Sequence, residues 1–225
     1  MTHPRRFEVG LALVVAALAL GCSSSSSKCE DGDDTSADCA KQAEVPGPSC
    51  DGNSLLLNCS FESPVVPVGG YQPFAPGDDI DGWTVIGAPG NVGPLSGAYV
   101  DQGLSWTAKE GAQTLNLTGT SGTATGVSQA VPTTPGRRYK LTFSIGNIVS
   151  PETGNGTTST VDLLINDAIV WSPYNSGGAG VTLMWMNFEY VFTAAKDSTS
   201  VGFVNADPAS DNSNILDSVG VVEAP

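Results

Sequence analysis

Two carboxylates stand near the two ends of the stretch that looks folded, each beside large apolar residues. Glu62 follows Phe61, and Asp217 has Leu216 before it and Val219 two residues after it. Two buried carboxylates repel each other unless a positive charge lies between them, and Ca²⁺ takes carboxylate and carbonyl oxygens as ligands. If the first and last strands lie side by side, the sequence predicts a structural Ca²⁺ held by Glu62 and Asp217. The alternative is that each carboxylate caps backbone amides or points to solvent.

A second kind of chemistry is suggested by aromatic residues in polar surroundings. Sugars are bound by aromatic planes that pack on the C–H faces of the ring, with amides and carboxylates bonding the hydroxyl groups. Trp106 is the strongest candidate, because residues 103–107 are polar and loop-like and offer its ring no obvious core position. Trp171 and Tyr174 enter a glycine-rich loop at the end of an apolar run, and Tyr99 is the fourth candidate. For each ring, packing in or near the core is the competing interpretation.

The N-terminus has the order of an export signal. Arg5 and Arg6 precede an apolar run over residues 11–20, and Gly21 and Cys22 follow. The run is shorter than the ~20 residues needed to cross a bilayer core as a helix. Residues 19–22 resemble the lipobox of bacterial lipoproteins, which implies that residues 1–21 are removed and that Cys22 carries a lipid anchor in the membrane. An ordinary secreted protein with a chance cysteine at the cleavage site is the alternative.

Four further cysteines remain once Cys22 is assigned to lipid. An even number in an oxidising compartment predicts two disulfides among three possible connectivities. Neighbour pairing, Cys29 with Cys39 and Cys50 with Cys59, closes the shortest loops. Zinc is disfavoured, since the spacing contains no CxxC and the one histidine, His3, lies in the signal segment.

The chain divides into a polar leader and an apolar body. Residues 22–53 hold a serine run and acidic residues with almost no large apolar side chain, so they are predicted to be a disordered tether. Residues 54–225 are predicted to be one domain. The net charge is -14, and beyond the signal segment Lys and Arg gather only at residues 137–140, which argues against nucleic acid or an anionic lipid surface as partner.

The body is predicted to be all β. Residues 138–145 alternate apolar and polar side chains, which is typical of a half-buried strand. About nine or ten such runs, separated by Gly, Pro, Asn and Asp turns, indicate a β-sandwich or jelly roll. The other runs cover residues 83–86, 113–117, 127–131, 161–165, 168–171, 188–192, 201–204 and 215–222.

Five motifs occur in the order seen in the DUF642 family. They lie at residues 57–62, 80–83, 113–119, 127–143 and 216–219. Over residues 55–222 the chain resembles that family and, more broadly, the galactose-binding-like jelly rolls of many carbohydrate-binding modules. The resemblance implies a jelly roll that binds carbohydrate, and calcium-binding members carry acids where Glu62 and Asp217 stand. Cys59 departs from the pattern, because the family has glycine there.

Catalysis finds little support in the motifs. The sequence has no G-x-S-x-G elbow, no Walker loop and no histidine after the signal segment. A glycosidase needs two carboxylates across a cleft, and Glu62 with Asp217, Glu152 or Glu189 is a candidate pair. The simplest account of Glu189 is an exposed strand face.

The sequence therefore predicts a non-enzymatic module, anchored by lipid at a bacterial surface or in the periplasm, that binds a polysaccharide. Ser23 after Cys22 resembles lipoproteins that are passed to the outer membrane. A structural or adhesive protein that binds another protein is the alternative, and a glycan-active enzyme is the least favoured.

Overall fold

The computed structural model describes residues 52–178 and 180–225, together with the backbone of residues 39–42. The predicted signal segment and the anchor Cys22 lie outside the described residues. Within them the chain is built from strands, turns and one three-residue 3₁₀ helix, η1 (Pro151–Thr153). No helix of the described part is long and apolar enough to cross a membrane.

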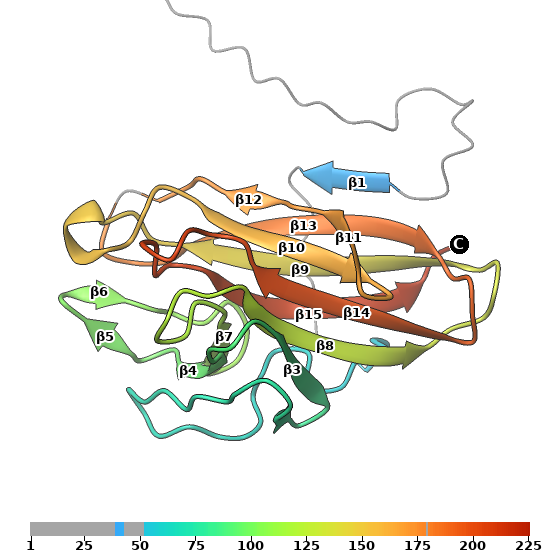
Figure 1. Ribbon diagram of the computed structural model, residues 1–225, viewed down its shortest axis with the longest axis horizontal. Coiled ribbons are helices and arrows are strands. Elements are labelled where there is room, and N and C mark those ends of the chain that lie inside the picture. Colours follow the sequence, from blue (N-terminus) through green and yellow to red (C-terminus); the bar gives the residue numbers. More distant parts are fainter. Residues whose placement is uncertain (1–38, 43–51, 179) are drawn as a thin grey trace, which may run out of the picture.

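Two antiparallel sheets stack face to face (Figure 1). The first has the order β1, β13, β9, β15, β7, β4, and the second has the order β11, β10, β14, β8, β3, β2, with β12 beside β10. The prediction of an all-β sandwich is confirmed. The strands of the first sheet are β1 (Cys39–Gln42), β13 (Met184–Thr193), β9 (Arg138–Asn147), β15 (Ile215–Glu223), β7 (Gln113–Asn116) and β4 (Gly93–Ser96). Those of the second are β11 (Ala168–Trp171), β10 (Ser159–Ile165), β14 (Ser198–Asn205), β8 (Thr125–Pro132), β3 (Trp83–Gly87), β2 (Asp79–Ile80) and β12 (Tyr174–Asn175).

Strand β9 shows how the sequence pattern becomes a core face. Tyr139, Leu141, Phe143 and Ile145 are buried, as their alternation predicts. The alternation ends after Phe143, because residues 143–147 are buried on both faces. At this end of the strand the outer face is covered: the ring of Trp185 lies over Gly146. The covered end of β9 is where the candidate site is found.

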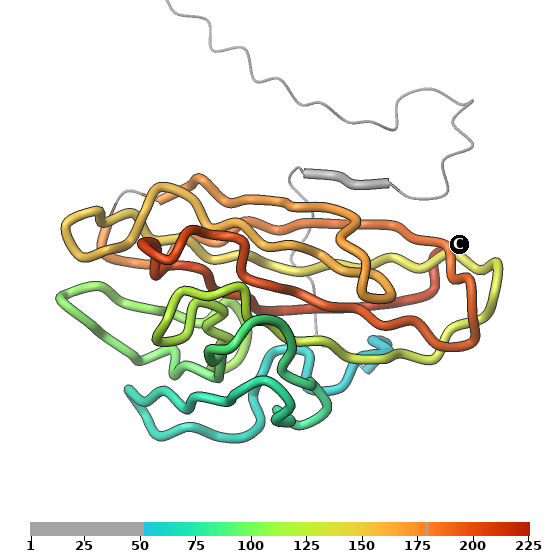
Figure 2. Tube along the Cα trace, in the orientation of Figure 1, coloured from blue at the N-terminus to red at the C-terminus, as the bar shows by residue number. Residues whose placement is uncertain are grey.

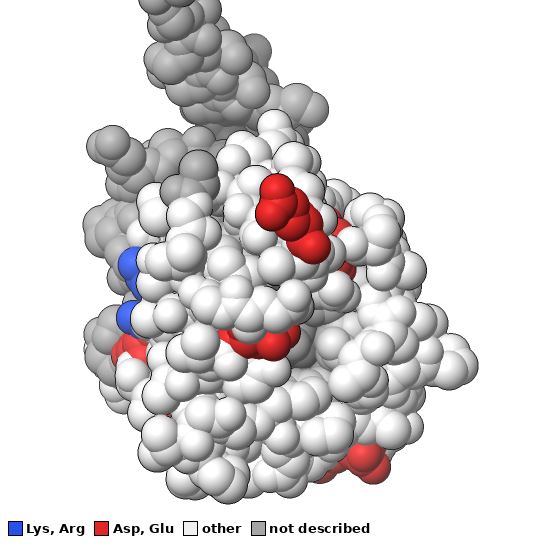
Figure 3. Space-filling model, turned by 90° about the vertical axis from the view of Figure 1, so that its left-hand side faces the viewer, with Lys and Arg blue, Asp and Glu red and all other residues white. Residues whose placement is uncertain are grey.

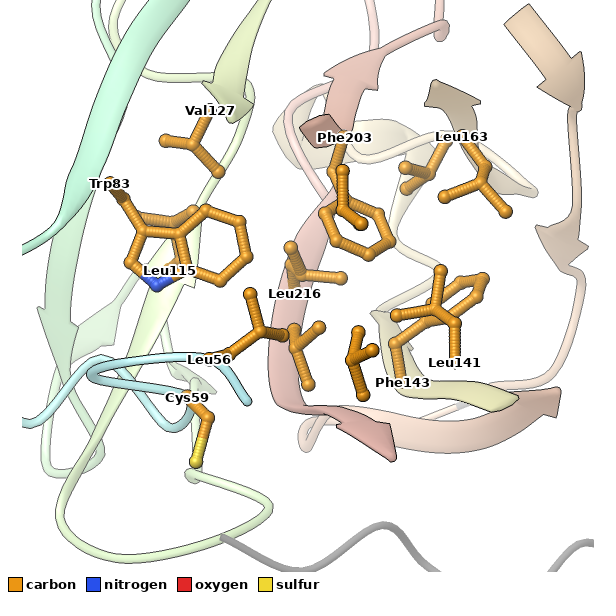
Figure 4. Close-up of a cluster of buried hydrophobic side chains, with 14 of the residues drawn as sticks. Leu56, Cys59, Trp83, Leu115, Val127, Leu141, Phe143, Leu163, Phe203 and Leu216 are labelled. Atoms are coloured by element: carbon orange, nitrogen blue, oxygen red, sulfur yellow. The ribbon is translucent and has the colours of Figure 1, made fainter. Parts of the chain in front are cut away.

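Aromatic rings hold the two sheets together. Phe143 of the first sheet meets Phe203 of the second, with ring centroids 5.0 Å apart, and Phe203 lies 6.2 Å from Trp83. Figure 4 shows these side chains converging in the layer between the sheets. Burying each such ring contributes about 2–3 kcal/mol. Phe61 and Trp83 are fully buried.

The segment expected to form the first strand is not a strand. Before β2 the chain runs as a long irregular connection, drawn cyan along the lower side of Figure 2. Asn58 and Phe61 have φ values of 47° and 57°, which no extended strand allows. The segment nevertheless lies against the last strand, since Leu55 N donates to the Val221 carbonyl at 2.8 Å and Val219 N donates to the Cys59 carbonyl at 2.8 Å. The first segment of the domain therefore lies beside the last strand, as expected, although it does not form a strand itself.

Four residues of the predicted tether also belong to the sandwich. Strand β1 pairs antiparallel with β13, with Cys39 opposite Val191 and Gln42 opposite Phe188. The backbone therefore reaches the edge of the first sheet before the main domain begins. The sequence contains no alternation there that predicts a strand.

Candidate ligand-binding site

A pocket of about 300 Å³ opens at one end of the sandwich. Three pieces meet there: the hairpin of β5 (Val100–Asp101) and β6 (Leu104–Ser105), the turn around η1, and the loop between β14 and β15. Figure 3 looks onto this end and shows a hollow beside acidic side chains near its middle. The pocket is lined by Tyr71, Leu95, Tyr99, Asp101, Gln102, Trp106, Asn116, Gly119, Thr120, Thr153, Asn155 and Asn212.

The β5–β6 hairpin positions four of the lining residues. Its turn consists of Gln102 and Gly103, both with positive φ, at 48° and 82°. Two such residues in succession make the tight turn that matches the twist of antiparallel strands, and glycine adopts this conformation without strain. The turn places Asp101 and Gln102 at the rim and brings Tyr99 and Trp106 together, where Trp106 N donates to the Tyr99 carbonyl at 3.1 Å.

Trp106 is both packed and part of the pocket. Its side chain is only 6% exposed and belongs to a second apolar cluster with Leu95, Leu104, Ile148, Leu183 and Ile215. Its indole Nε1 is buried and has no hydrogen-bond partner in the described part of the chain. The sequence placed this ring in a loop without a core role. The residue does lie in a loop, but its ring forms part of a small core beneath the pocket.

Tyr71 forms a wall that the sequence did not indicate. Its hydroxyl donates to Asn91 Oδ1 at 2.8 Å, and Asn91 Nδ2 donates to Thr120 Oγ1 at 2.7 Å. Burial raises the pKa of Tyr71 well above its ordinary value, so the phenol stays neutral. Asn91 thus fixes a tyrosine and a threonine on the same side of the pocket.

Side-chain amides form another wall of the pocket. Asn155 follows the η1 turn, is 4% exposed, and donates from Nδ2 to Thr153 Oγ1 at 2.8 Å. Its Oδ1 is buried without a partner among the described residues. Asn212 is held next to it, because Asn212 N donates to the Gly154 carbonyl at 3.0 Å. The wall therefore offers one acceptor, Asn155 Oδ1, that the protein itself leaves unpaired.

The charges around the pocket are acidic. Asp101 is the one charged side chain among the lining residues, and it is exposed. Asp211 and Asp207 lie in the loop that carries Asn212, and both are buried. Burial raises the pKa of Asp207 to about 7, the Thr160 N–H lowers it, and the negative charge of Asp211 raises it further. Anions are disfavoured at this end of the molecule.

The structure separates the four aromatic residues that the sequence proposed for sugar binding. Tyr99 and Trp106 line the pocket. Trp171 does not: its ring lies against Phe143, Phe188 and Tyr190, with centroids 5.8–6.3 Å apart. Tyr174 is 48% exposed on β12 and is not among the lining residues. Asn212, in the loop between β14 and β15, also lines the pocket.

Glu62 and Asp217 converge on one short segment. Asp217 Oδ2 accepts from Lys109 N at 2.8 Å and from Glu110 N at 3.1 Å. Glu62 Oε1 accepts from the N–H groups of residues 112 and 113, each at 2.9 Å. Both carboxylates therefore cap backbone amides, which was the alternative to a metal, and both reach the same loop, which the metal hypothesis requires.

The fit of this pair to Ca²⁺ is mixed. The donors are oxygens, which suit a hard cation. Burial raises the pKa of Asp217 to about 8, against the N–H groups of Glu110, Lys109 and Ser218 that lower it. A cation would replace the proton that this carboxyl otherwise keeps. No group of three or more His, Cys, Asp or Glu within the described ranges is arranged to hold a metal, so Ca²⁺ stays a prediction.

Cys59 is buried at 8% exposure and is disulfide-bonded. Its partner lies outside the described side chains, as do Cys29, Cys39 and Cys50, so the predicted pairing is unresolved. Figure 4 shows its sulfur at the edge of the core. The cysteine that replaces the glycine of the resembled family therefore connects the packed segment to another part of the chain.

Comparison with known proteins gives one family and several distant folds. The model of the HpiC1-like family, described as HpiC1 cyclase, matches residues 54–205. No curated protein sequence matches the chain. The family match does not extend to DUF642, which stays a resemblance.

Among solved structures, the chain is similar to a Cbm61 module, TmCBM61, in complex with β-1,4-galactotriose, at 14% identity over 76% of this chain and 99% of that one, with a TM-score of 0.41. It is also similar to the CBM22-1 xylan-binding domain from Paenibacillus barcinonensis Xyn10C at 15% identity. That match covers 71% of this chain and 97% of that one, with a TM-score of 0.38. The sugar-binding EclA C-terminal domain matches at 15% identity over 42% of this chain and 64% of that one, with a TM-score of 0.34. At these values the likenesses assign no function.

Proposed function

This chain belongs to the HpiC1-like family, and we propose that its end pocket binds a small hydroxyl-bearing ligand, such as a sugar unit of a polysaccharide. The observation that carries the proposal is the composition of the pocket. Three aromatic side chains, Tyr71, Tyr99 and Trp106, line the same cavity as four side-chain amides. Aromatic planes and convergent amides are what a sugar ring requires.

The size and the unpaired atoms support the same ligand class. A volume of about 300 Å³ is at the small end for ligand pockets, which suits one or two rings rather than a long chain. The lining residues carry one buried donor without a partner, Trp106 Nε1, and one such acceptor, Asn155 Oδ1. Buried polar groups are nearly always paired, and a hydroxyl group both accepts and donates. A small shift of either side chain would let a ligand hydroxyl pair with it.

The test is a glycan array followed by calorimetric titration of any binder. Trp106→Phe keeps an aromatic ring in the apolar cluster and removes the Nε1–H, so it is preferable to Trp106→Ala, which would cost about 3–5 kcal/mol of stability. We expect Trp106→Phe and Asn155→Ala to weaken binding, and the matched control Tyr174→Ala, an exposed ring outside the pocket, to leave it unchanged. Absence of binding across the array removes the carbohydrate proposal and favours the alternative of a protein ligand.

A second candidate function is catalysis of a cyclisation, because the family is named for a cyclase. The sequence predicted a non-enzyme, and that prediction is not confirmed. Cyclisation through a cationic intermediate needs a surface that stabilises positive charge, and the Asp101 carboxylate beside the rings of Tyr99 and Trp106 supplies one. Cyclisation forms an isomer, so chromatography of unsaturated alcohols incubated with the protein is the assay. A new isomer that Asp101→Asn fails to form would establish catalysis.

We also propose that Cys22 anchors the chain to a bacterial membrane, with the outer membrane favoured. The support is the sequence of the export signal and the lipobox resemblance. Mass spectrometry of the mature N-terminus tests it: an acylated Cys22 is expected, and Cys22→Ser should release the protein from the membrane fraction. A mature chain that begins elsewhere contradicts the proposal.

A further inference from the structure

We propose that the end pocket prefers a sugar unit with a free, protonated amine over its neutral and acidic counterparts. The inference rests on the proposed function and specifies its ligand. It follows from how charge is distributed around the pocket, combined with the unpaired polar atoms of the lining.

The pocket offers a negative charge that forms no ion pair within the described residues. Asp101 lies at the exposed tip of the β5–β6 hairpin, next to Tyr99 and within the same lining as Trp106. The two ion pairs of the described residues join Arg137 to Glu223 and Lys140 to Glu189, so neither involves Asp101. A ligand ammonium could therefore pair with Asp101 without displacing a protein cation.

No cationic side chain lines the pocket, and Lys109, three residues after Trp106, is exposed and lies outside the lining. Figure 3 shows blue atoms only at the margin of this end. Arg137 and Arg138 lie where β9 begins, and the pocket lies where β9 ends. At ~3.3 Å per residue the length of β9 separates the two by ~30 Å, several times the ~8 Å screening length at physiological salt. A ligand carboxylate would find no counter-charge in the lining.

The aromatic walls favour the same ligand. A cation over the face of a tyrosine or tryptophan ring is attracted by the ring electrons, and Tyr99 and Trp106 stand beside Asp101 in the lining. The unpaired Asn155 Oδ1 is an acceptor, which an N–H donor satisfies as well as a hydroxyl does. Because Asp101 is exposed, its ion pair should change affinity by only about twofold to fivefold at low salt. The preference should therefore be modest and salt-dependent.

The experiment compares matched ligands that differ at one substituent. Oligosaccharides built on glucose and on galactose are titrated calorimetrically in four forms: free amine, acetylated amine, hydroxyl and carboxylate. Measurements at about pH 5.5 keep the amine protonated, and they are made at ~20 mM and ~500 mM salt, because high salt screens an exposed pair. Asp101→Asn is compared with Asp167→Asn, which removes an exposed carboxylate from the β10–β11 turn, away from the pocket lining.

We expect the free-amine form to bind about twofold to fivefold more tightly than the acetylated form at low salt, and the carboxylate form to bind most weakly. Asp101→Asn should abolish the difference between amine and acetylated forms, whereas Asp167→Asn should preserve it. Equal affinity of the amine, acetylated and hydroxyl forms, or tightest binding of the carboxylate form, overturns the charge preference and leaves the proposed function standing. Binding of none of the forms overturns both.

Discussion

Replacing Asp207 by asparagine tests how much the buried carboxyl group in the loop behind the pocket costs the folded protein. Asp207 Oδ1 accepts from Thr160 N at 2.8 Å, while Oδ2 is buried without a partner in the described structure. Asn214 lies within hydrogen-bonding reach of this carboxyl, and its own Oδ1 is also unpaired. An asparagine at 207 keeps the bond from Thr160 and can turn its NH₂ group toward Asn214 Oδ1. Asp207→Asn should therefore give a hydrogen-bond partner to Asn214 Oδ1 and to the group that replaces Asp207 Oδ2. It also removes one buried charge.

The magnitude follows from the pKa of Asp207, which burial raises from 3.8 to about 7. Between these values the folded protein holds a proton that the unfolded chain has released. The free energy of unfolding therefore falls as pH rises, by about 1.4 kcal/mol per pH unit. From pH 5 to pH 7 this group costs roughly 2 kcal/mol, or about 4–8 °C in melting temperature for a domain of this size. Below pH 4 the effect vanishes.

The assay is thermal melting of the wild type and of Asp207→Asn between about pH 4 and pH 9, with chelator present. The wild type should lose stability as pH rises from 5 to 7, and the variant should lose less by roughly 2 kcal/mol. Asp217, whose pKa burial raises to about 8, contributes equally to both proteins and cancels. Parallel pH profiles, or a variant that is less stable at pH 7, would refute the reasoning. Asp167→Asn, which removes an exposed carboxylate, is the control.

Three further predictions concern Glu62, Asp217 and the residues around them. If Glu62 and Asp217 hold Ca²⁺, Ca²⁺ should raise the melting temperature and chelator should lower it, as RT ln(1 + [L]/Kd) requires, and no shift in either direction removes the proposal. Gly111→Ala should destabilise the fold by about 1 kcal/mol or more in urea unfolding, because Gly111 has φ 68° and a Cβ there would lie 2.3 Å from Glu62 Oε1. If the variant were as stable as the wild type, the loop would be free to move away from Glu62. Cys59→Ser should cost about 2–5 kcal/mol under oxidising conditions and far less after reduction. An equal loss under both conditions would mean that packing, not the disulfide, matters at Cys59.

The central strands were predictable because their two faces meet different surroundings. Arg138 to Phe143 alternate in sequence and in burial, since one face of β9 packs on the second sheet and the other meets solvent. The run at residues 83–86 follows the same rule, since Trp83 and Val85 are buried and Thr84 between them is exposed. Where both faces are covered, as at Ser144, the polar residue is buried against the alternation and bonds Asn187 Oδ1 at 2.9 Å instead.

The pocket was only half predictable, because it is made by short elements and loops. Strands β5 and β6 have two residues each, too few to show a period, and the Gln102-Gly103 turn between them was not recognised. Tyr99 and Trp106 were found as aromatics in polar context. Tyr71 and Asn155 come from loops more than 80 residues apart in sequence, and only the packed fold brings them into one lining.

The most direct test of ligand binding in the end pocket is the indole N–H signal of Trp106 in a ¹⁵N-resolved NMR titration. Trp106 Nε1 has no partner in the described chain, whereas Trp83 Nε1 already donates to the Asn58 carbonyl at 3.2 Å. Addition of a bound glycan should shift the Trp106 indole resonance in a saturable way and leave that of Trp83 in place. A glycan that binds while the Trp106 resonance stays unchanged would contradict the assignment of this pocket.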